Sequence, residues 1–241
     1  MLLKTRGIVF KALKYSETSF ICEVYTEERG LQSYIFSGVR TAKPSTRAAL
    51  LQVMTLLDLV AYGRDGQALH RVREVHPAVV YQSIPFSASK RAIGLFCIEV
   101  AQKTIRETEA NPALFEFLFS FFHYLDISEK PLPNLPLFFL LHLAAYLGFA
   151  PLGEPTDDAP YFDLVEGTFV EYRRSDLLTL DAEGSSALFN LLNANTAVAA
   201  ALPLKKNIRN ALLEHLLLYY YQHVDGMREI ASHHILRTIL A

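Results

Sequence analysis

The chain has 241 residues, of which 51% are hydrophobic and 20% are charged, and its formal net charge is −2. This composition is typical of a globular protein with one large or two modest domains and argues against disorder. The two cysteines, Cys22 and Cys97, are too few for a disulfide framework, so a reducing cytoplasm is the expected compartment. We expect no signal peptide, and the longest apolar run, residues 137–150, is shorter than the roughly 20 residues that span a bilayer.

The first third of the chain is predicted to form a small β domain. Short segments rich in β-branched and aromatic residues cover residues 4–14, 20–26, 31–37, 54–62 and 69–75. Gly30 can supply the positive φ of a hairpin turn between the second and third segments. Five short strands in about 75 residues suit a small barrel such as an OB fold, which binds single strands through a basic groove and stacking aromatic side chains.

The charges of the chain are unevenly distributed. Residues 1–80 contain eleven Lys and Arg against seven Asp and Glu, whereas residues 81–241 contain twelve against eighteen. No acidic residue occurs between Arg29 and Leu57. Because contacts of Lys and Arg with phosphates supply most sequence-independent affinity for DNA, the basic front part is predicted to bind nucleic acid.

Two aromatic residues of the third predicted strand, Tyr34 and Phe36, share one face and could stack on bases, with Tyr15, Phe20, Tyr25 and Tyr62 nearby in the chain. The alternative is that these rings fill the barrel. The candidate DNA-binding residues are therefore the cations of this part together with two rings: Lys4, Arg6, Lys11, Lys14, Arg29, Tyr34, Phe36, Arg40, Lys43 and Arg47.

The rest of the chain is predicted to be mainly helical. Helices are expected from Ser87 or Ser89 to about Glu107, from Pro112 to about Leu125, and over residues 136–147, 186–200, 208–223 and 229–240. A small hairpin is expected over residues 161–172, turning at Glu166 and Gly167. The fold class is thus α+β, with an N-terminal five-stranded barrel over residues 1–80 and a mainly α-helical body with a small β-hairpin insertion over residues 81–241.

Several segments, in order and spacing, resemble the bacterial DNA repair family RecO. They include Thr5-Arg6-Gly7-Ile8-Val9, Val24-Tyr25-Thr26-Glu27-Glu28-Arg29-Gly30, Ser37-Gly38-Val39-Arg40, Leu56-Leu57-Asp58-Leu59-Val60-Ala61-Tyr62, Tyr146-Leu147-Gly148-Phe149-Ala150-Pro151 and Tyr161-Phe162-Asp163-Leu164-Val165-Glu166-Gly167. The resemblance implies an OB fold joined to a helical body without catalytic chemistry. It further implies a recombination mediator, associated with the nucleoid, that binds single- and double-stranded DNA, anneals complementary strands and, with RecR, loads RecA onto DNA coated by single-strand-binding protein.

The resemblance also implies recognition of the acidic, hydrophobic C-terminal tail of single-strand-binding protein. Such a tail needs apolar burial for its ring and cations for its carboxylates. Two groups of cations in the helical body are candidates, and the sequence does not choose between them: Lys103, Arg106 and Lys130, and Lys205, Lys206 and Arg209.

Many RecO proteins have a four-cysteine zinc site in the region that corresponds to residues 150–175 here. This chain has neither Cys nor His in the stretch after Pro151, from Leu152 to Pro160, so we expect a cysteine-less hairpin region, no metal site and no cofactor. His215 and His223 are eight residues apart on one predicted helix, about 12 Å at 1.5 Å per residue, which is too far to share an ion.

An enzyme is the first alternative, but the chain lacks a phosphate-binding glycine loop, a Gly-x-Ser-x-Gly elbow and a His-Glu-x-x-His pair. The sequence therefore favours a protein that is not an enzyme. The second alternative is a protein–protein adaptor whose OB domain has lost most of its DNA affinity, since the front part has a modest net charge and the body is acidic.

Overall fold

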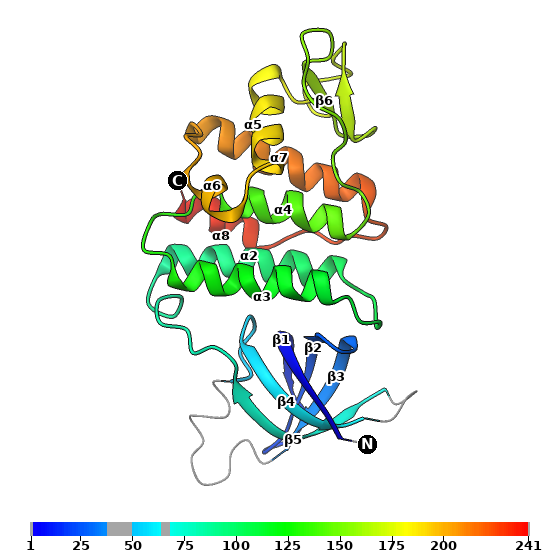
Figure 1. Cartoon of the computed structure of the whole chain (residues 1–241), viewed down its shortest axis with the longest axis vertical. Coiled ribbons are helices and arrows are strands. Elements are labelled where there is room, and N and C mark those ends of the chain that lie inside the picture. Colours follow the sequence, from blue (N-terminus) through cyan, green and yellow to red (C-terminus); the bar gives the residue numbers. More distant parts are fainter. Residues whose placement is uncertain (1, 38–49, 64–67, 241) are drawn as a thin grey trace. The chain divides into compact units, whose positions relative to one another are not determined.

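The computed structural model of the chain describes residues 2–37, 50–63 and 68–240 (Figure 1). The described chain divides into two compact units, Met1–Ile127 and Ser128–Ala241. Arg40, Lys43 and Arg47 lie outside the described residues.

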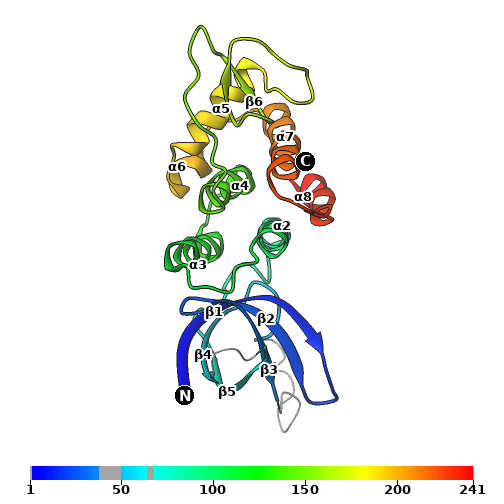
Figure 2. The ribbon, with the colours of Figure 1, turned by 90° about the vertical axis from the view of Figure 1, so that its right-hand side faces the viewer.

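The first unit begins with a closed barrel of five strands (Figure 2). The strands are β1 (Leu2–Lys14), β2 (Phe20–Thr26), β3 (Gly30–Phe36), β4 (Leu56–Tyr62) and β5 (His70–Pro77). Their order around the barrel is β1-β2-β3-β5-β4, and β3 and β5 are the parallel pair. This is the five-stranded barrel of the OB fold, so the predicted fold class is confirmed.

Alternation along the strands builds the core of the barrel. Val9, Val24 and Leu59 are fully buried and belong to the same apolar cluster inside the barrel. Phe10 and Tyr25, the next residues of β1 and β2, are also buried, because they stack in a row with Phe115 of the helical part of this unit. The long β1 closes the barrel because its first half pairs with β4 and its second half pairs with β2. A register shift between Val9 and Lys11 lies on the β2 side of this strand, where it accommodates the bend.

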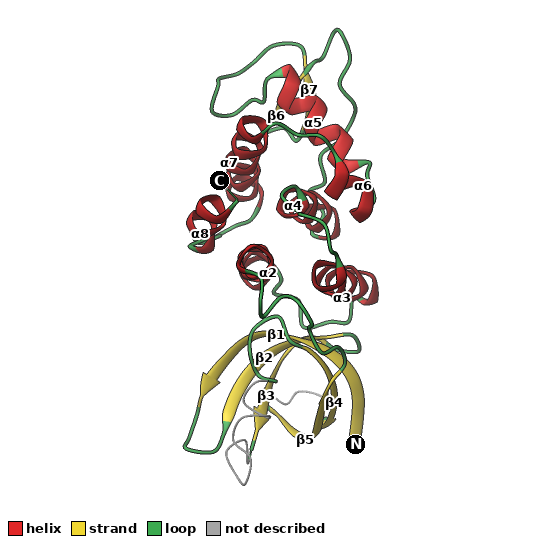
Figure 3. Ribbon diagram, turned by 90° about the vertical axis from the view of Figure 1, so that its left-hand side faces the viewer, coloured by secondary structure: helices red, strands yellow, loops and turns green. Residues whose placement is uncertain are grey.

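Two helices belong to the same unit as the barrel: α2 (Ala88–Thr104) and α3 (Pro112–Ile127) (Figure 3). Ser87 caps α2 as expected, since its side chain accepts a hydrogen bond from Lys90 N. The rings of Phe10, Tyr25 and Phe115 are stacked in a row, with centroid distances of 5.5 and 6.3 Å, and they join the barrel to α3. Because α2 and α3 pack with the barrel, the division between the two compact units falls after residue 127. We predicted the domain boundary at residue 80, where the chain changes from strands to helices.

The second unit contains α4 (Leu135–Tyr146), a two-stranded sheet of β6 (Tyr161–Asp163) and β7 (Thr168–Val170), α5 (Ala182–Leu192), α6 (Thr196–Ala201), α7 (Lys206–His223) and α8 (Ser232–Ile239). The single helix predicted over residues 186–200 is wrong. The chain forms α5 and α6 instead, because Asn195 starts a new helix by accepting a hydrogen bond from Val198 N. Within the described ranges, no helix is long and apolar enough to cross a membrane.

Candidate nucleic-acid interface

Tyr34 and Phe36 do share one face of β3, but that face is the inside of the barrel. Tyr34 is fully buried and Phe36 is 3% exposed. The register of β2 and β3 places Tyr34 opposite Cys22, another core residue, and the Tyr34 ring lies 5.5 Å from the ring of His70. The prediction that Tyr34 and Phe36 stack on bases is therefore wrong, and both side chains belong to the core.

Arg6 is held by the first unit itself. Its guanidinium donates two hydrogen bonds of 2.8 Å to the Glu27 carboxylate and one of 2.9 Å to Glu116 of α3. The same group lies over the rings of Phe115 and Phe119, 5.1 and 4.8 Å from their centroids. The hydrogen bond from the Arg6 guanidinium stabilises the charged form of Glu27 and so lowers the pKa of this carboxyl. We assign Arg6 to the packing of α3 on the barrel, and its role in DNA binding stays a prediction.

The other predicted cations of the described barrel differ in their surroundings. Lys4 and Lys14 are exposed near opposite ends of β1. Lys11 pairs across the sheet with Glu23 at 3.6 Å. Arg29 is half-buried, and its guanidinium lies against Gly63 at the end of β4. Lys4 and Lys14 thus have the clearest access to a phosphate backbone among these four.

Strand β5 adds three basic side chains that sequence reasoning missed. Arg71, Arg73 and His76 are exposed, and Arg73 Nε lies 3.1 Å from Glu74 Oε1. The alternation of side chains along this strand could have identified them, because it places Arg71 outward between the inward-facing His70 and Val72. A cationic strand therefore lies beside β3 in the closed barrel.

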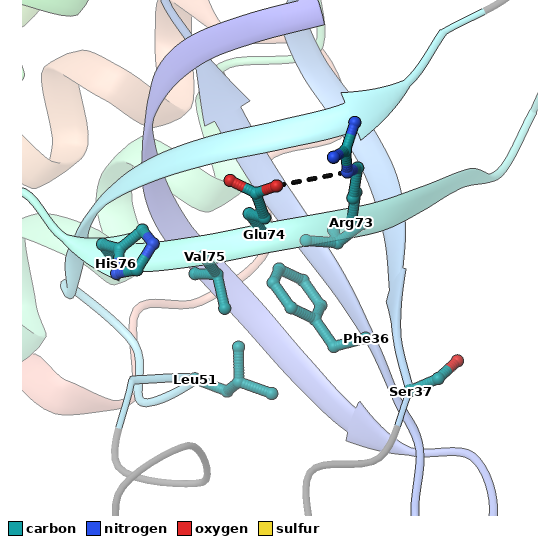
Figure 4. Close-up of a pocket in the computed structure, with 8 residues that line it drawn as sticks. Phe36, Ser37, Leu51, Arg73, Glu74, Val75 and His76 are labelled. Carbon is teal, nitrogen blue, oxygen red and sulfur yellow. Dashed lines mark ion pairs between the residues drawn. The ribbon is translucent and has the colours of Figure 1, made fainter. Parts of the chain in front are cut away.

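A cavity of about 150 Å³ opens between the end of β3 and strand β5. Figure 4 shows the side chains of Phe36, Leu51 and Val75 turned toward one another, with the Arg73–Glu74 ion pair on the other side of β5, and all five residues line the cavity. The cavity therefore has apolar walls and an ion pair at its rim.

The comparisons with known proteins agree with this architecture. A family model described as "Recombination protein O N terminal" matches residues 1–81, and one described as "Recombination protein O C terminal" matches residues 86–229. The DNA repair protein RecO of Christiangramia forsetii is 34% identical over 241 residues, which cover 99% of each chain. The chain belongs to the RecO family. The resemblance inferred from the sequence is thereby confirmed, and the family is one of DNA repair and recombination proteins.

Two further relatives of this RecO-family chain have the same printed name. The DNA repair protein RecO of Flavobacterium psychrophilum is 33% identical over 248 residues, which cover 100% of each chain. That of Bacteroides fragilis is 31% identical over 242 residues, which cover 99% of each chain.

The candidate tail-binding cations of the RecO body fall in different units. Lys103 and Arg106 belong to the first unit, where Lys103 Nζ lies 2.6 Å from Glu99 Oε1. Lys130, Lys205 and Lys206 are exposed in the second unit, and Lys205 pairs with Glu183 at 3.0 Å.

Arg209, one of these six cations, lines a pocket of the second unit. The pocket lies between α4, α7 and α8, and its walls are mostly leucine and proline: Pro133, Pro136, Leu137, Arg209, Asn210, Leu213, Leu236, Arg237 and Leu240. Burial lowers the pKa of the Arg209 guanidinium, which donates a hydrogen bond of 3.4 Å to Leu204 O. A half-buried cation on an apolar wall gains from an arriving carboxylate, because part of its hydration has already been lost.

The cysteine-less hairpin of this RecO chain is held by ordinary protein contacts. The Asp163 carboxylate accepts hydrogen bonds from Val165 N and Glu166 N at the turn, and Arg174 Nε lies 3.0 Å from it. Gly167 completes the turn with φ +68. Phe162 is fully buried and packs edge-on against Phe169 and Tyr219. A polar turn and an aromatic cluster therefore stabilise the hairpin.

The helical histidines take part in packing as well. His215 Nδ1 lies 2.7 Å from Ala211 O, and His223 Nε2 lies 2.9 Å from Leu164 O. The His223 ring stacks on Phe149 at 5.6 Å. In the described part of the chain, no group of three or more His, Cys, Asp or Glu is placed to hold a metal ion.

Proposed function

We propose that this chain is a recombination mediator of DNA repair that acts without catalysing a reaction. It binds single- and double-stranded DNA, anneals complementary strands and, with RecR, helps load RecA onto DNA coated by single-strand-binding protein. We place it in the cytoplasm, in association with the nucleoid. Family membership supports the pathway, and the observation that carries DNA binding is a closed OB barrel with exposed Lys4, Lys14, Arg71 and Arg73.

Affinity for a labelled single strand is expected to fall steeply as salt increases, because each neutralised phosphate releases condensed counterions. Replacing Arg40, Lys43 and Arg47 with alanine is expected to weaken single-strand binding and annealing about tenfold or more at moderate salt. It should also reduce the slope of log affinity against log salt by up to about two, at roughly 0.7 per phosphate contact. Fluorescence anisotropy over a salt series measures both quantities.

The matched control removes three exposed cations of the second unit, Lys130, Lys206 and Arg228, and should leave the slope of the original protein. Equal losses in the two triple variants would show that only net charge matters. Unchanged DNA binding in the first variant would contradict the role of Arg40, Lys43 and Arg47 in DNA binding. Absence of DNA binding by the original protein would favour the adaptor function.

We further propose that the pocket around Arg209 receives the acidic, hydrophobic tail of single-strand-binding protein. A tail peptide with its carboxylates at Arg209 and Arg237 would place its apolar side chains against Pro133 and Leu240, which are half-buried at the pocket, whereas Leu213 and Leu236 are buried. The pocket has a volume of about 10 Å³, so the helices must separate to admit a ring. Arg237 lies 3.2 Å from Glu214 Oε1, so the peptide must compete with that ion pair, whereas no ion pair holds Arg209 among the described residues.

Replacing Arg209 with alanine is expected to weaken binding of the tail peptide about tenfold, because a charge-assisted hydrogen bond is worth roughly 1.5–3 kcal/mol. Replacing Lys103 is the matched control, since it removes a cation of the competing group. Calorimetric titration of the peptide into each full-length variant distinguishes the two sites. A loss in the Lys103 variant alone would move the tail site to the first unit.

We also propose that the chain works without a metal or other cofactor. Elemental analysis of the purified protein, freed of loosely bound ions, is expected to find far less than one zinc ion per chain. The polar turn of Asp163 and the aromatic packing of Phe162 support this, since they stabilise the hairpin where other family members use cysteines. One tightly bound zinc per chain would contradict the proposal.

A further inference from the structure

Three neighbouring strands of the barrel place Ile35, Arg71 and Tyr62 in one outward-facing row. Ile35 of β3 pairs with Arg71 of β5, and Arg71 pairs on its other side with Tyr62 of β4. The preceding residues of β3 and β5, Tyr34 and His70, are both buried. Since side chains alternate along a strand, Ile35 and Arg71 face outward.

The row continues on both sides with apolar residues. On one side Ile35 pairs with Ile21, which pairs with Leu13; on the other side Tyr62 pairs with Leu2. The exposed fractions are 50% for Tyr62, 53% for Leu13 and 44% for Leu2. Strand pairing thus gathers apolar side chains, far apart in the sequence, around a single guanidinium on the solvent-facing side of the barrel.

The charges around this row favour an anionic ligand. The row contains no acidic residue, and Lys14 follows Leu13 at its end. The acids nearest in the strands are already matched by cations, because Glu23 lies 3.6 Å from Lys11 and Glu74 lies 3.1 Å from Arg73. A ligand that combines negative charge with flat apolar faces fits this surface better than an acidic or a purely apolar protein surface.

We propose that this row is where the barrel contacts the bases of a single-stranded nucleic acid, with one base stacked on Tyr62 and a neighbouring phosphate at Arg71. The inference rests on the proposed DNA-binding function and adds to it the residues that contact the bases of a single strand. A single strand offers unstacked bases whose flat faces can meet a tyrosine ring, whereas a duplex offers mainly its phosphates. Tyr62 should therefore matter for single strands only, and Arg71 for both substrates.

The test compares full-length Tyr62→Ala, Tyr62→Phe and Arg71→Ala on a single strand and on a duplex of equal length. Tyr62→Ala is expected to weaken single-strand binding about fivefold or more, because it removes the stacking of one base on an aromatic ring. It should change duplex binding less than twofold. Tyr62→Phe keeps the ring and should bind like the original protein. Arg71→Ala should weaken binding to both substrates and lower the salt slope by about one or less.

Tyr172→Ala is the matched control, because Tyr172 is a 77% exposed tyrosine of the second unit. Circular dichroism and a thermal melt verify that each variant is folded. Unchanged single-strand binding of Tyr62→Ala, equal losses on both substrates, or loss of binding to RecR alone would overturn the inference while leaving DNA binding in place. If the original protein bound neither substrate, the proposed DNA-binding function would fail as well.

Discussion

Replacing Asp126 with alanine is expected to destabilise the first unit by about 3 kcal/mol or more. Asp126 is 2% exposed at the end of α3, and its carboxylate accepts backbone hydrogen bonds of 2.8–2.9 Å from Gln82, Ser83 and Ile84. These residues connect the barrel to α2. Without the carboxylate, three donors lose their partner, and an unpaired buried donor costs roughly 1–3 kcal/mol. Denaturant unfolding of the full chain, followed through a probe in the first unit, measures the change.

Two further variants test whether the loss of stability comes from the hydrogen bonds of the Asp126 carboxylate. Asparagine can keep the bonds of Oδ1 to Ser83 N and Ile84 N but not the bond of Oδ2 to Gln82 N, so Asp126→Asn should cost about 1–2 kcal/mol. Glu17→Gln, in an exposed turn of the same unit, should cost almost nothing. Equal stabilities of the alanine variant and the original protein would show that this connection does not depend on Asp126.

The same bonds make the contribution of Asp126 depend on pH. Burial by itself would raise the pKa of this carboxyl, but the backbone hydrogen bonds outweigh it and the pKa is lowered. When the pKa of a carboxyl is lower in the folded than in the unfolded state, its charged form stabilises the fold. This stabilisation is fully present above the unfolded-state pKa, about 3.9, and is lost as pH falls through the folded-state pKa. The difference in unfolding free energy between Asp126→Asn and the original protein should therefore shrink in acid.

Replacing Gly30 with alanine is expected to destabilise the same unit by about 3 kcal/mol or more. Gly30 has φ +60, and an added Cβ would lie 2.2 Å from Glu109 O and 2.9 Å from Glu107 O. Both are backbone atoms of the segment after α2, which also accepts a hydrogen bond of 3.0 Å from Leu31 N. The turn between β2 and β3 must move away from this segment to admit a methyl group. Thermal unfolding of the variant measures the loss.

Gly148→Ala is the control for Gly30→Ala. Gly148 has φ +88 at the end of α4, but an added Cβ would meet no atom within 4 Å. Its cost should be the conformational strain alone, about 1–2 kcal/mol. A similar cost at both positions would mean that the turn separates easily from residues 107–109, and that their contact adds little stability.

The sequence predicted the elements whose signals are local. Alternating strands, the turn at Gly30 and the cap at Ser87 depend on neighbours a few residues away, and each appears in the structure. The Ser87 side chain, for example, accepts a hydrogen bond from Lys90 N. The break between α5 and α6 was missed, because the cap at Asn195 competes with a helix that its apolar spacing also allowed.

The candidate site depended on contacts that are distant in sequence. Arg6 was predicted to bind phosphate, yet Glu116, 110 residues away, is one of its partners. Nothing near Arg6 in the chain indicates that α3 packs on that part of the barrel. The spacing of Tyr34 and Phe36 predicted a shared face, but which face is inward depends on pairing with β2 and β5.

An OB barrel followed by helices, the resemblance to RecO and the basic front part could all be inferred from the amino-acid order. They follow from the period of the strands, the order of the motifs and the count of charges, which need no knowledge of contacts between distant residues. Which basic and aromatic side chains a ligand can reach depends on such contacts. Barrel closure buried Tyr34 and Phe36, α3 engaged Arg6, and the pairing of β3, β5 and β4 brought Ile35, Arg71 and Tyr62 together.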